Sequence, residues 1–344
     1  MTAPSVDRVE LTTVDDDGAV FHVADEAGTV TPDELTALVP DTAYEHLGVS
    51  FRTLPRPSGR LLTRFGTVND VHFGEVEAGR VDDHADGPIL RVPPGADPYP
   101  EVMNRAAVAD LGAADLDAVI VKGDLTSTAA PEEFDAFAAT YGGAFGDHLH
   151  VVRGNHDAVG GQTAYAGDRL IELPGVAIAL IDTVIPNAPS GTLLPEQLDW
   201  LDDVAAASTD PVIVMGHHQQ WLTGKREPGY FGLDPDASDA LAGVAARRPA
   251  IVAYTAGHTH RHRVRAMASG VPSIEVGCVK DFPGTWAEYR VYEGGILQVV
   301  HRLSSPEALA WSEACRVLYS DFGVDYVTYA LGRLDERCFV VPLR

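Results

Sequence analysis

The sequence predicts an α/β (α+β) fold preceded by a small all-β module, and three observations support this prediction. From "LLTRFGTVND" onward, apolar runs alternate with segments of helical composition, which is the pattern of an α/β core around a largely buried sheet. Residues 1 to about 60 instead carry short β-branched runs such as "VELTTV" and "VSFRTLP", separated by Asp, Gly and Pro. Finally, five of the later apolar runs each end in a cluster of polar side chains.

Composition divides the chain into three expected parts. Residues 1–60 form a small β-rich module, residues 61–303 the α/β domain, and residues 304–344 an extension that packs on that domain or on a partner subunit. Helices are expected near residues 100–113, 131–142, 195–206, 236–247 and 305–319, several of them beginning at Asp, Ser or Pro. Residues 73–99 are rich in Gly, Asp and Pro and form a long insertion, and insertions of that length are more often functional than not.

The charge of the chain limits its partners. The formal net charge is −25, from 50 acidic and 25 basic residues, and such a field repels polyanions. We therefore expect no nucleic-acid polymer as a partner, whereas a small phosphorylated molecule fits if bound cations reverse the sign locally. Three cysteines without CxxC spacing, no signal-peptide pattern and no apolar stretch of about 20 residues lead us to expect a cytoplasmic protein without a membrane segment.

The five polar clusters carry the chemistry. They hold Asp70 and His72 after "RFGTVN", Asp124 after "LDAVIVKG", Asn155, His156 and Asp157 after "LHVVRG", His217 and His218 after "PVIVMG", and His258 and His260 after "AIVAYTAG". In open α/β sheets the carboxyl ends of the strands line one crevice, so residues far apart in the sequence meet there. We therefore expect these side chains to form a single site.

The residue types in these clusters indicate a metal site. Carboxylate and imidazole suit divalent cations such as Mn, Fe and Zn, and the absence of thiolates argues against a structural zinc site. Seven candidate ligands are too many for one tetrahedral ion, but they suffice for two ions that share a carboxylate. A glycine precedes four of the candidates, Asp124, Asn155, His217 and His258, where a Cβ would obstruct a sharp turn.

The motifs D-x-H, G-D, G-N-H-D, G-H-H and G-H-x-H, in this order and spacing, resemble those of the calcineurin-like metallophosphoesterase superfamily over roughly residues 63–301. The resemblance implies a four-layer αββα sandwich and hydrolysis of a phosphoester by in-line attack of a hydroxide that bridges two metal ions. It implies that one ion is held by Asp70, His72, Asp124 and His260, and the other by Asn155, His217, His258 and the shared Asp124. His156 would be the catalytic histidine, and Asp157 would be its orienting partner or, as an equal alternative, a cap of the following turn.

Two finer resemblances concern the branch and the N-terminus. "IDTVIPNAPSGTLLPEQLDWLDD" is similar to a segment of the class III cyclic-nucleotide phosphodiesterases, although Gln219 stands where that branch usually has Pro. "GDLTS" lacks the Asp-Arg-Gly continuation of Ser/Thr protein phosphatases. "LVPDTAYEHLGVSFRTLP" looks like the end of a fibronectin-type or purple-acid-phosphatase-type β domain, in which Tyr44 would brace a corner.

Several functional alternatives stay open on the sequence. The substrate is a small-molecule phosphodiester, such as a cyclic nucleotide, or a phosphomonoester. A nuclease is disfavoured by the negative charge, and a non-catalytic scaffold by the fact that every motif position is filled. His218, Lys280 and Arg261 are candidates for contact with the substrate, and His218 is favoured as a support for His217. A homodimer through the aromatic C-terminal stretch is a further alternative.

Overall fold

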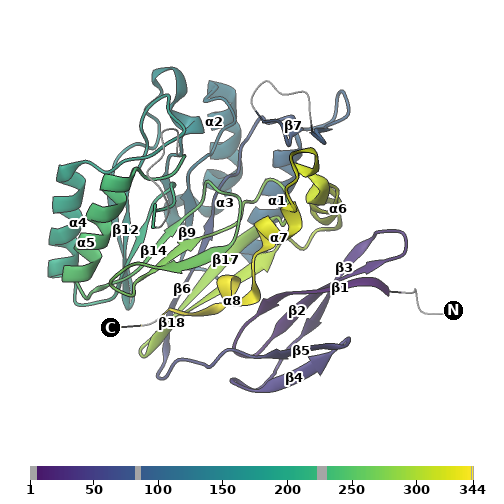
Figure 1. The fold of residues 1–344 in the computed structure, drawn as a ribbon, viewed down its shortest axis with the longest axis horizontal. Helices are drawn as coiled ribbons and strands as arrows, with labels where there is room; N and C mark the ends of the chain where they lie inside the picture. The colour runs from purple at the N-terminus through teal and green to yellow at the C-terminus, as the bar shows by residue number, and fades with distance from the viewer. Residues whose placement is uncertain (1–5, 82–86, 223–230, 342, 344) are drawn as a thin grey trace.

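The computed structural model of the chain describes residues 6–341 except 82–86 and 223–230, together with residue 343. Two six-stranded sheets stack face to face, helices cover their outer faces, and a separate β module lies below them in Figure 1. The expected four-layer αββα sandwich with a small N-terminal β module is therefore confirmed. Among the described residues, no helix has both the length and the apolar composition needed to cross a bilayer.

The first sheet is mixed. Its strand order is β10 (Leu149–Val152), β9 (Ala118–Lys122), β6 (Leu61–Val68), β17 (Thr285–Tyr292), β18 (Gly295–Arg302) and β19 (Phe339–Val341). The first three strands run parallel to one another and the others are antiparallel to their neighbours. Helices α1 (Tyr99–Ala113) and α2 (Pro131–Phe137) cover its outer face through side chains such as Met103 and Phe137. A π-helical turn, η1 (Ala138–Gly142), and two short turns, α3 (Gly143–Phe145) and η2 (Gly146–His148), continue α2.

The second sheet has four parallel strands at its centre. Its order is β11 (Arg169–Leu173), β12 (Val176–Leu180), β13 (Val212–Met215), β14 (Ile251–Ala256), β16 (Pro272–Glu275) and β15 (Arg263–Ala266). Helices α4 (Pro195–Ala207) and α5 (Pro235–Arg247) pack on its outer face through Leu201 and Leu241. The carboxylate of Asp234 caps α5 by accepting a hydrogen bond from the backbone N–H of Ala237, at 2.8 Å.

The main core lies between the two sheets. The stacked rings of Phe65 and Tyr289, with centroids 4.7 Å apart, pack there beside aliphatic side chains from both sheets. Every residue of β9, β12 and β13 is buried, because these strands have a packed layer on each face. Burial on both faces is the physical reason that these strands appear in the sequence as continuous apolar runs.

The N-terminal module consists of a three-stranded sheet and a hairpin. The sheet is β1 (Val6–Val14), β2 (Ala19–Asp25) and β3 (Val30–Leu35), and the hairpin is β4 (Ala43–His46) and β5 (Val49–Arg52). Phe21 of the sheet packs edge-on against Phe51 of the hairpin, with ring centroids 5.6 Å apart. The hydroxyl of Tyr44 accepts a hydrogen bond from the backbone N–H of Val39, at 2.8 Å, so Tyr44 braces this turn as expected.

The C-terminal segment lies between the N-terminal module and the stacked sheets (Figure 1). It comprises α6 (Pro306–Ala314), η4 (Cys315–Val317), η5 (Ser320–Phe322), α7 (Tyr326–Leu331) and α8 (Leu334–Arg337), and then enters β19. The prediction of one helix over residues 305–319 is wrong beyond Ala314. Leu318 is extended and Tyr319 has a φ of +61°, and neither conformation continues an α-helix.

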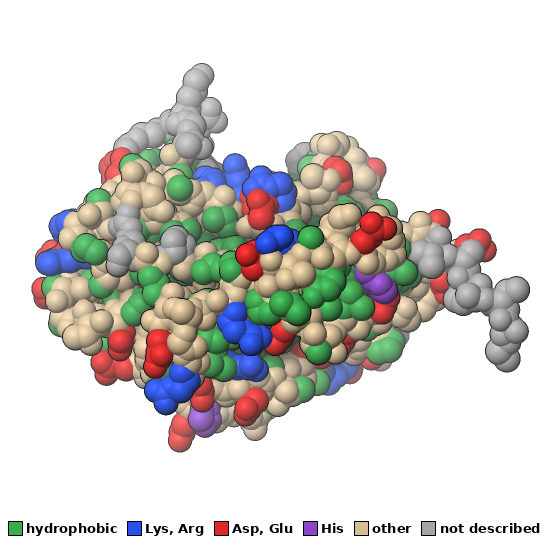
Figure 2. All heavy atoms as spheres, turned by 90° about the horizontal axis from the view of Figure 1, so that it is seen from below, with side chains coloured by type: hydrophobic (Ala, Val, Ile, Leu, Met, Phe, Trp, Pro, Cys, Tyr) green, Lys and Arg blue, Asp and Glu red, His purple; other side chains and the backbone are tan. Residues whose placement is uncertain are grey.

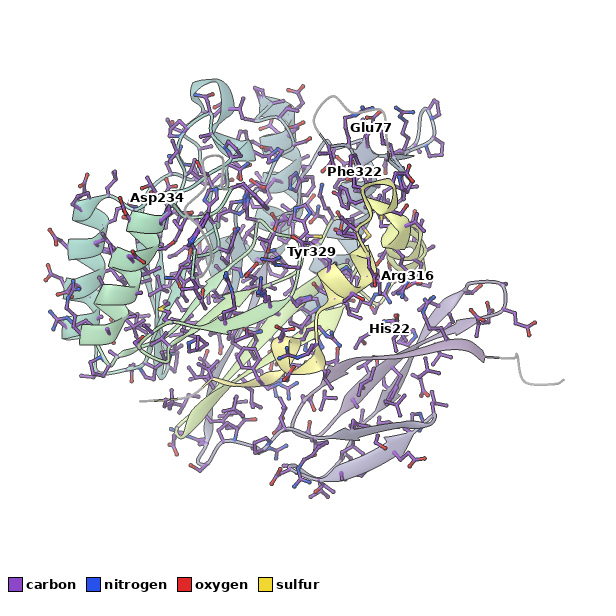
Figure 3. The ribbon with its side chains drawn as sticks, in the orientation of Figure 1. His22, Glu77, Asp234, Arg316, Phe322 and Tyr329 are labelled. Carbon is purple, nitrogen blue, oxygen red and sulfur yellow. The ribbon has the colours of Figure 1, made fainter. Side chains whose placement is uncertain are left out.

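Hydrogen bonds join all three parts of the chain, and the Thr13 hydroxyl donates to the backbone carbonyl of Val300 in β18, at 2.7 Å. The buried guanidinium of Arg337 donates to the backbone carbonyls of Leu11 and Thr12, both at 3.0 Å. Arg316 donates to both carboxylate oxygens of Glu10, at 2.6 and 2.9 Å. Figure 3 shows Arg316 on the C-terminal segment, next to the N-terminal module, which carries His22. The limits at residues 60 and 303 therefore mark changes of composition, and their role as domain boundaries stays a prediction.

The insertion after the first motif forms a short ribbon. Strands β7 (Glu77–Ala78) and β8 (Leu90–Arg91) pair antiparallel within residues 73–99, of which 82–86 lie outside the described residues.

The surface of the molecule carries both signs of charge. Figure 2 shows acidic and basic side chains interspersed on one face of the molecule, so the net charge of −25 is spread rather than segregated there.

Candidate metal centre

The predicted ligands follow five strands, three that are neighbours in the first sheet and two that are neighbours in the second. Asp70 and His72 follow β6, Asp124 follows β9, Asn155 follows β10, His217 follows β13, and His258 and His260 follow β14. The structure brings these side chains together at the carboxyl ends of the strands. In three overlapping groups, Asp70 with His72 and His260, Asp70 with Asp124 and His217, and His217 with His218 and His258, the potential ligand atoms lie within 4.8 Å of one another.

Asp124 lies between two sets of imidazoles. Its Oδ2 is 3.4 Å from Nε2 of His72 and 3.3 Å from Nε2 of His217. On the side of His72, Oδ1 of Asp70 lies 3.5 Å from Nε2 of His260. On the other side, Nε2 of His217 lies 3.2 Å from the side-chain oxygen of Asn155. One carboxylate thus faces both halves of the cluster.

The other half is completed by His258. Its Nδ1 lies 3.2 Å from Nε2 of His217, and its Nε2 is buried without a hydrogen-bond partner among the described residues. Both ring nitrogens of His72 are in the same situation. Buried polar atoms without partners are uncommon in folded proteins, and lone pairs that face one another repel unless a cation or a proton lies between them. The set of imidazole, carboxylate and carboxamide donors therefore fits divalent cations such as Mn, Fe or Zn.

The backbone that carries these ligands is strained. Five of the seven predicted ligands have positive φ angles, namely Asp70 at +54°, His72 at +43°, Asp124 at +51°, His258 at +68° and His260 at +52°. This region is sparsely populated by residues other than glycine, and such strain persists where surrounding structure enforces it, commonly at functional sites. The loops thus hold side-chain positions that relaxed backbone would not supply.

Glycines make room for the ligands. Gly123 has a φ of +87°, and a Cβ built on it would lie 2.5 Å from Nδ1 of His217. A Cβ on Gly154 would lie 2.2 Å from Oδ1 of Asp124. The expectation that glycines clear space beside the ligands is confirmed at these two positions. At Gly154 the requirement is for space alone, because its φ is not positive.

Burial and charge prepare the imidazoles in two ways. Burial lowers the pKa of His72 to about 4 and that of His258 to about 3, so both rings are neutral near pH 7 and present lone pairs. Burial also acts to lower the pKa of His217 and of His260, but the nearby carboxylates outweigh it. Asp124 raises the pKa of His217 to about 9, and Asp70 raises that of His260 to about 10. Without an ion, these two rings hold protons beside the carboxylates.

In His217, His72 and His260, the ring nitrogen Nδ1 faces an oxygen atom of a neighbouring residue. Nδ1 of His217 donates to the backbone carbonyl of Lys122, at 2.8 Å, and Nδ1 of His72 lies 3.4 Å from Oε2 of Glu75. Nδ1 of His260 lies 3.6 Å from Oδ2 of Asp281. Such neighbours orient a metal-ligating imidazole. Glu75 and Asp281 were missed from the sequence, because neither belongs to a motif and only the fold brings them to the rings.

His156 lies at the mouth of the cluster. Its Nδ1 donates to the backbone carbonyl of Ser127, at 2.8 Å, and its ring centroid is 4.7 Å from that of His72. Together with His72, Asp124, His258, His260 and Lys280 it lines a cavity of about 570 Å³. The orienting group of His156 is thus the Ser127 carbonyl.

The prediction that Asp157 orients His156 is therefore wrong. The buried carboxylate of Asp157 accepts hydrogen bonds from the backbone N–H groups of Gly154, Leu125 and Thr126 and from the Thr126 hydroxyl, at distances of 2.7 to 3.0 Å. Asp157 ties the loop after β10 to the loop after β9. Sequence order could not distinguish this role from that of a partner for the neighbouring histidine.

The three candidates for substrate contact are all engaged. The buried ring of His218 shares a hydrogen bond of 2.8 Å with the Thr183 hydroxyl and lies edge-on to His217, as a supporting residue would. Lys280 lines the cavity but donates to both carboxylate oxygens of Glu75, at 2.6 and 2.8 Å.

Arg261 is held away from that cavity. Its Nε donates to Oε2 of Glu275, at 2.7 Å, and its guanidinium carbon lies 5.1 Å from the ring centroid of Tyr329. Arg261 is not one of the described residues that line the cavity beside His156. The prediction that Arg261 contacts the phosphate is not supported by this position.

The stacked sheets and the strand-end cluster of Asp, Asn and His side chains define an αββα protein with a candidate metal centre. The sequence pattern of the calcineurin-like phosphoesterase family matches residues 63–262, which is more than half of the chain. The chain belongs to this family, as the five motifs predicted.

Relatives agree with this assignment. A probable cyclic nucleotide phosphodiesterase of Synechococcus is 26% identical over 151 residues, which cover 42% of this chain and 58% of that protein. The match thus spans less than two thirds of the relative. A dimetal phosphatase from Danio rerio has a TM-score of 0.51 at 16% identity, with 70% of this chain and 96% of that chain covered. A purple acid phosphatase from yellow lupin has the same TM-score at 13% identity, with 84% and 57% covered, and these two likenesses show the fold.

Proposed function

We propose that the chain is a two-metal phosphoesterase that hydrolyses a phosphodiester or a phosphomonoester of a small molecule. The observation that carries the proposal is the position of Asp124, whose single oxygen Oδ2 faces His72 on one side and His217 on the other. In this proposal Asp70, His72, Asp124 and His260 hold one ion. Asn155, His217 and His258 hold the other and share Asp124 with the first.

The chemistry follows from these residues. When bound, two ions of Mn, Fe or Zn supply a nucleophile from water at neutral pH and neutralise charge on the phosphate oxygens. The Ser127 carbonyl fixes the ring of His156 by accepting from Nδ1, which leaves Nε2 for the substrate. In its protonated form, His156 donates from Nε2 to the leaving oxygen as the phosphorus–oxygen bond breaks. The strained ligand loops keep the donors in place before substrate arrives.

The substrate class rests on similarity and charge. The Synechococcus relative favours a phosphodiester, with a cyclic nucleotide as one case, over a monoester. The net charge of −25 favours a small substrate over a nucleic-acid polymer.

All three cysteines are buried and unpaired, which fits a reducing compartment such as the cytosol. A homodimer stays a prediction.

The test uses the whole chain loaded with Mn. We expect hydrolysis of bis-p-nitrophenyl phosphate or p-nitrophenyl phosphate, and a diester preference of about tenfold or more, equivalent to about 1.4 kcal/mol in the transition state, would assign the phosphodiesterase branch. H156A should retain its metal yet lose about 10²-fold or more in kcat. The matched control is H148A, which removes an exposed histidine outside the cluster. Equal turnover of H156A and the wild type would refute the role of His156.

A further inference from the structure

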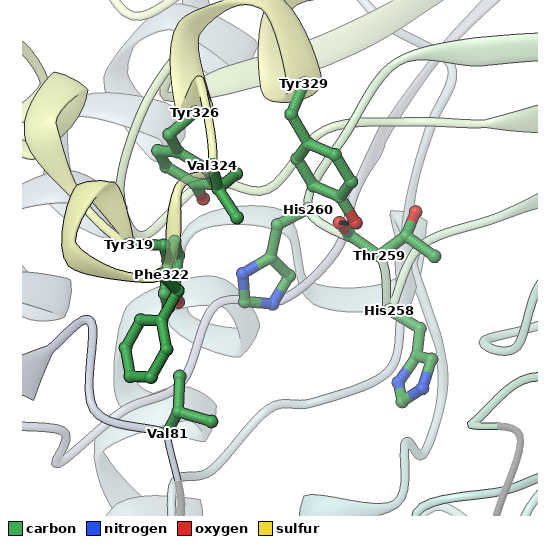
Figure 4. Close-up of a pocket in the computed structure, with 9 residues that line it drawn as sticks. All are labelled: Val81, His258, Thr259, His260, Tyr319, Phe322, Val324, Tyr326 and Tyr329. Carbon is green, nitrogen blue, oxygen red and sulfur yellow. Dashed lines mark hydrogen bonds between the residues drawn. The ribbon is translucent and has the colours of Figure 1, made fainter. Parts of the chain in front are cut away.

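A second cavity, of about 520 Å³, lies beside the ligand cluster (Figure 4). One wall is built largely from hydrophobic side chains, namely Val81, Tyr319, Phe322, Val324, Tyr326 and Tyr329. All but Val81 come from the C-terminal segment, and in Figure 4 their side chains gather around His260. A cavity of this volume lies in the range that holds a small molecule.

The two cavities adjoin each other. His258, His260 and Tyr319 line both of them. A phosphate group held at the ligand cluster therefore has the apolar cavity directly beside it. A group that the ester oxygen carries on that side can contact the aromatic wall.

The aromatic wall is fixed by its own hydrogen bonds. The hydroxyl of Tyr329 donates to the backbone carbonyl of Thr259, at 2.9 Å, and the hydroxyl of Tyr326 donates to Oδ1 of Asp281, at 2.7 Å. The Tyr319 and Tyr326 rings meet edge-on with centroids 5.0 Å apart. Because these two hydroxyls are already engaged, the rings of Tyr326 and Tyr329 offer mainly apolar surface. A preorganised wall costs little ordering entropy when a ligand binds.

We propose that this cavity binds an aromatic ring carried by the substrate, such as a nucleobase or an aryl group, and that the C-terminal segment therefore selects the substrate. The proposal rests on the proposed phosphoesterase function, because the phosphate anchors the ring beside the wall. Several aromatic side chains favour a flat ring, which they contact by stacked or edge-on geometry. An aromatic phosphoester is thus preferred over one with a small aliphatic group.

Two phosphonates test the proposal without turnover. Phenylphosphonate and methylphosphonate carry the same anionic group and differ in the ring, and neither has an ester bond to break. Isothermal titration calorimetry on the Mn-loaded chain should give a Kd about tenfold lower for phenylphosphonate, from the apolar surface that the ring buries. F322A and V324S should reduce that ratio to about threefold or less and leave methylphosphonate binding unchanged.

The matched control is L170A, because Leu170 in β11 is 44% exposed and Phe322 is 39% exposed. L170A should keep the wild-type ratio, and circular dichroism checks that each variant is folded. Equal affinities of the two phosphonates for the wild type, or an unchanged ratio in both cavity variants, would overturn the aromatic site. If neither phosphonate binds and no p-nitrophenyl ester is hydrolysed, the phosphoesterase function itself fails, and the aromatic site with it.

Discussion

Oδ2 of Asp281 lies 3.6 Å from Nδ1 of His260, while its Oδ1 accepts a hydrogen bond from the Tyr326 hydroxyl at 2.7 Å. One buried carboxylate thus links the C-terminal segment to a predicted metal ligand. The contact gives the segment a second role besides lining the apolar cavity, because it helps to set the direction in which Nε2 of His260 points.

We expect D281N to weaken the binding of one ion by about tenfold or more, since carboxylates behind a ligating imidazole contribute about that much to metal affinity. The substitution keeps the side-chain size and removes the negative charge. Stepwise Mn titration by calorimetry measures the effect. D335N, at an exposed position in α8, serves as the control, and an unchanged titration of D281N would contradict the orienting role.

Asp124 should matter to both ions. Its Oδ2 faces His72 and His217, so D124A removes a donor from each half of the cluster. We expect elemental analysis of dialysed D124A to find neither ion. The comparison is D70A, which removes a donor next to His260 and should lose chiefly one ion. Two ions retained by D124A would show that it does not bridge.

Metal binding should release protons at neutral pH. The pKa of His217 is raised to about 9 and that of His260 to about 10, so both rings are protonated at pH 7 in the metal-free protein. An ion needs the neutral ring, so the apparent affinity should rise as the pH rises from 6 toward 9. Calorimetry at pH 7 in buffers of different ionisation enthalpy counts the released protons. A count of zero would contradict the raised pKa values.

Asp157 should affect stability more than chemistry. D157A leaves three backbone N–H groups and the Thr126 hydroxyl without their buried acceptor, so we expect the free energy of unfolding to fall by about 3 kcal/mol. Urea denaturation measures this loss, and D147A, at an exposed position, is the control. A fully stable D157A with lost turnover would return Asp157 to a catalytic role.

The sequence predicted the fold and the ligand cluster for a physical reason. Strands such as Val212–Met215 are buried at every position, so their apolar runs stand out, and the polar residues that follow mark the strand ends. Parallel strands bring those ends to one rim of each sheet, and the stacking of the two sheets places His217 near Asp124.

Contacts that depend on tertiary geometry could not be predicted. Asp281 and Tyr326 are 45 residues apart and meet only because the helix after Ser305 stops at Ala314 and the chain turns at Tyr319. No periodic pattern marks that turn, since an aromatic residue at positive φ runs against local preference. The sequence therefore showed the aromatic residues of the C-terminal segment, but it could not predict that they form the wall of an apolar cavity.

Arg337 bonds to both the N-terminal module and the end of α7. Besides Leu11 and Thr12, Arg337 donates to the carbonyls of Leu331 and Gly332, at 2.7 and 2.9 Å. R337A should therefore lower the free energy of unfolding by about 3 kcal/mol, because four acceptors lose one buried partner. The rate of backbone hydrogen exchange should rise in β1 (Val6–Val14), because the substitution removes the hydrogen bonds from Arg337 to this strand.

The same variant should act on the apolar cavity. Leu331 and Gly332 lie at the end of α7, which carries Tyr326 and Tyr329, so R337A should also raise exchange in α7 and weaken phenylphosphonate binding more than methylphosphonate binding. R333A provides the control, because Arg333 is 71% exposed and pairs with Asp335. Faster exchange confined to β1 would show that the module docks without influence on the cavity. Unchanged exchange in both elements would show that Arg337 does not hold them together.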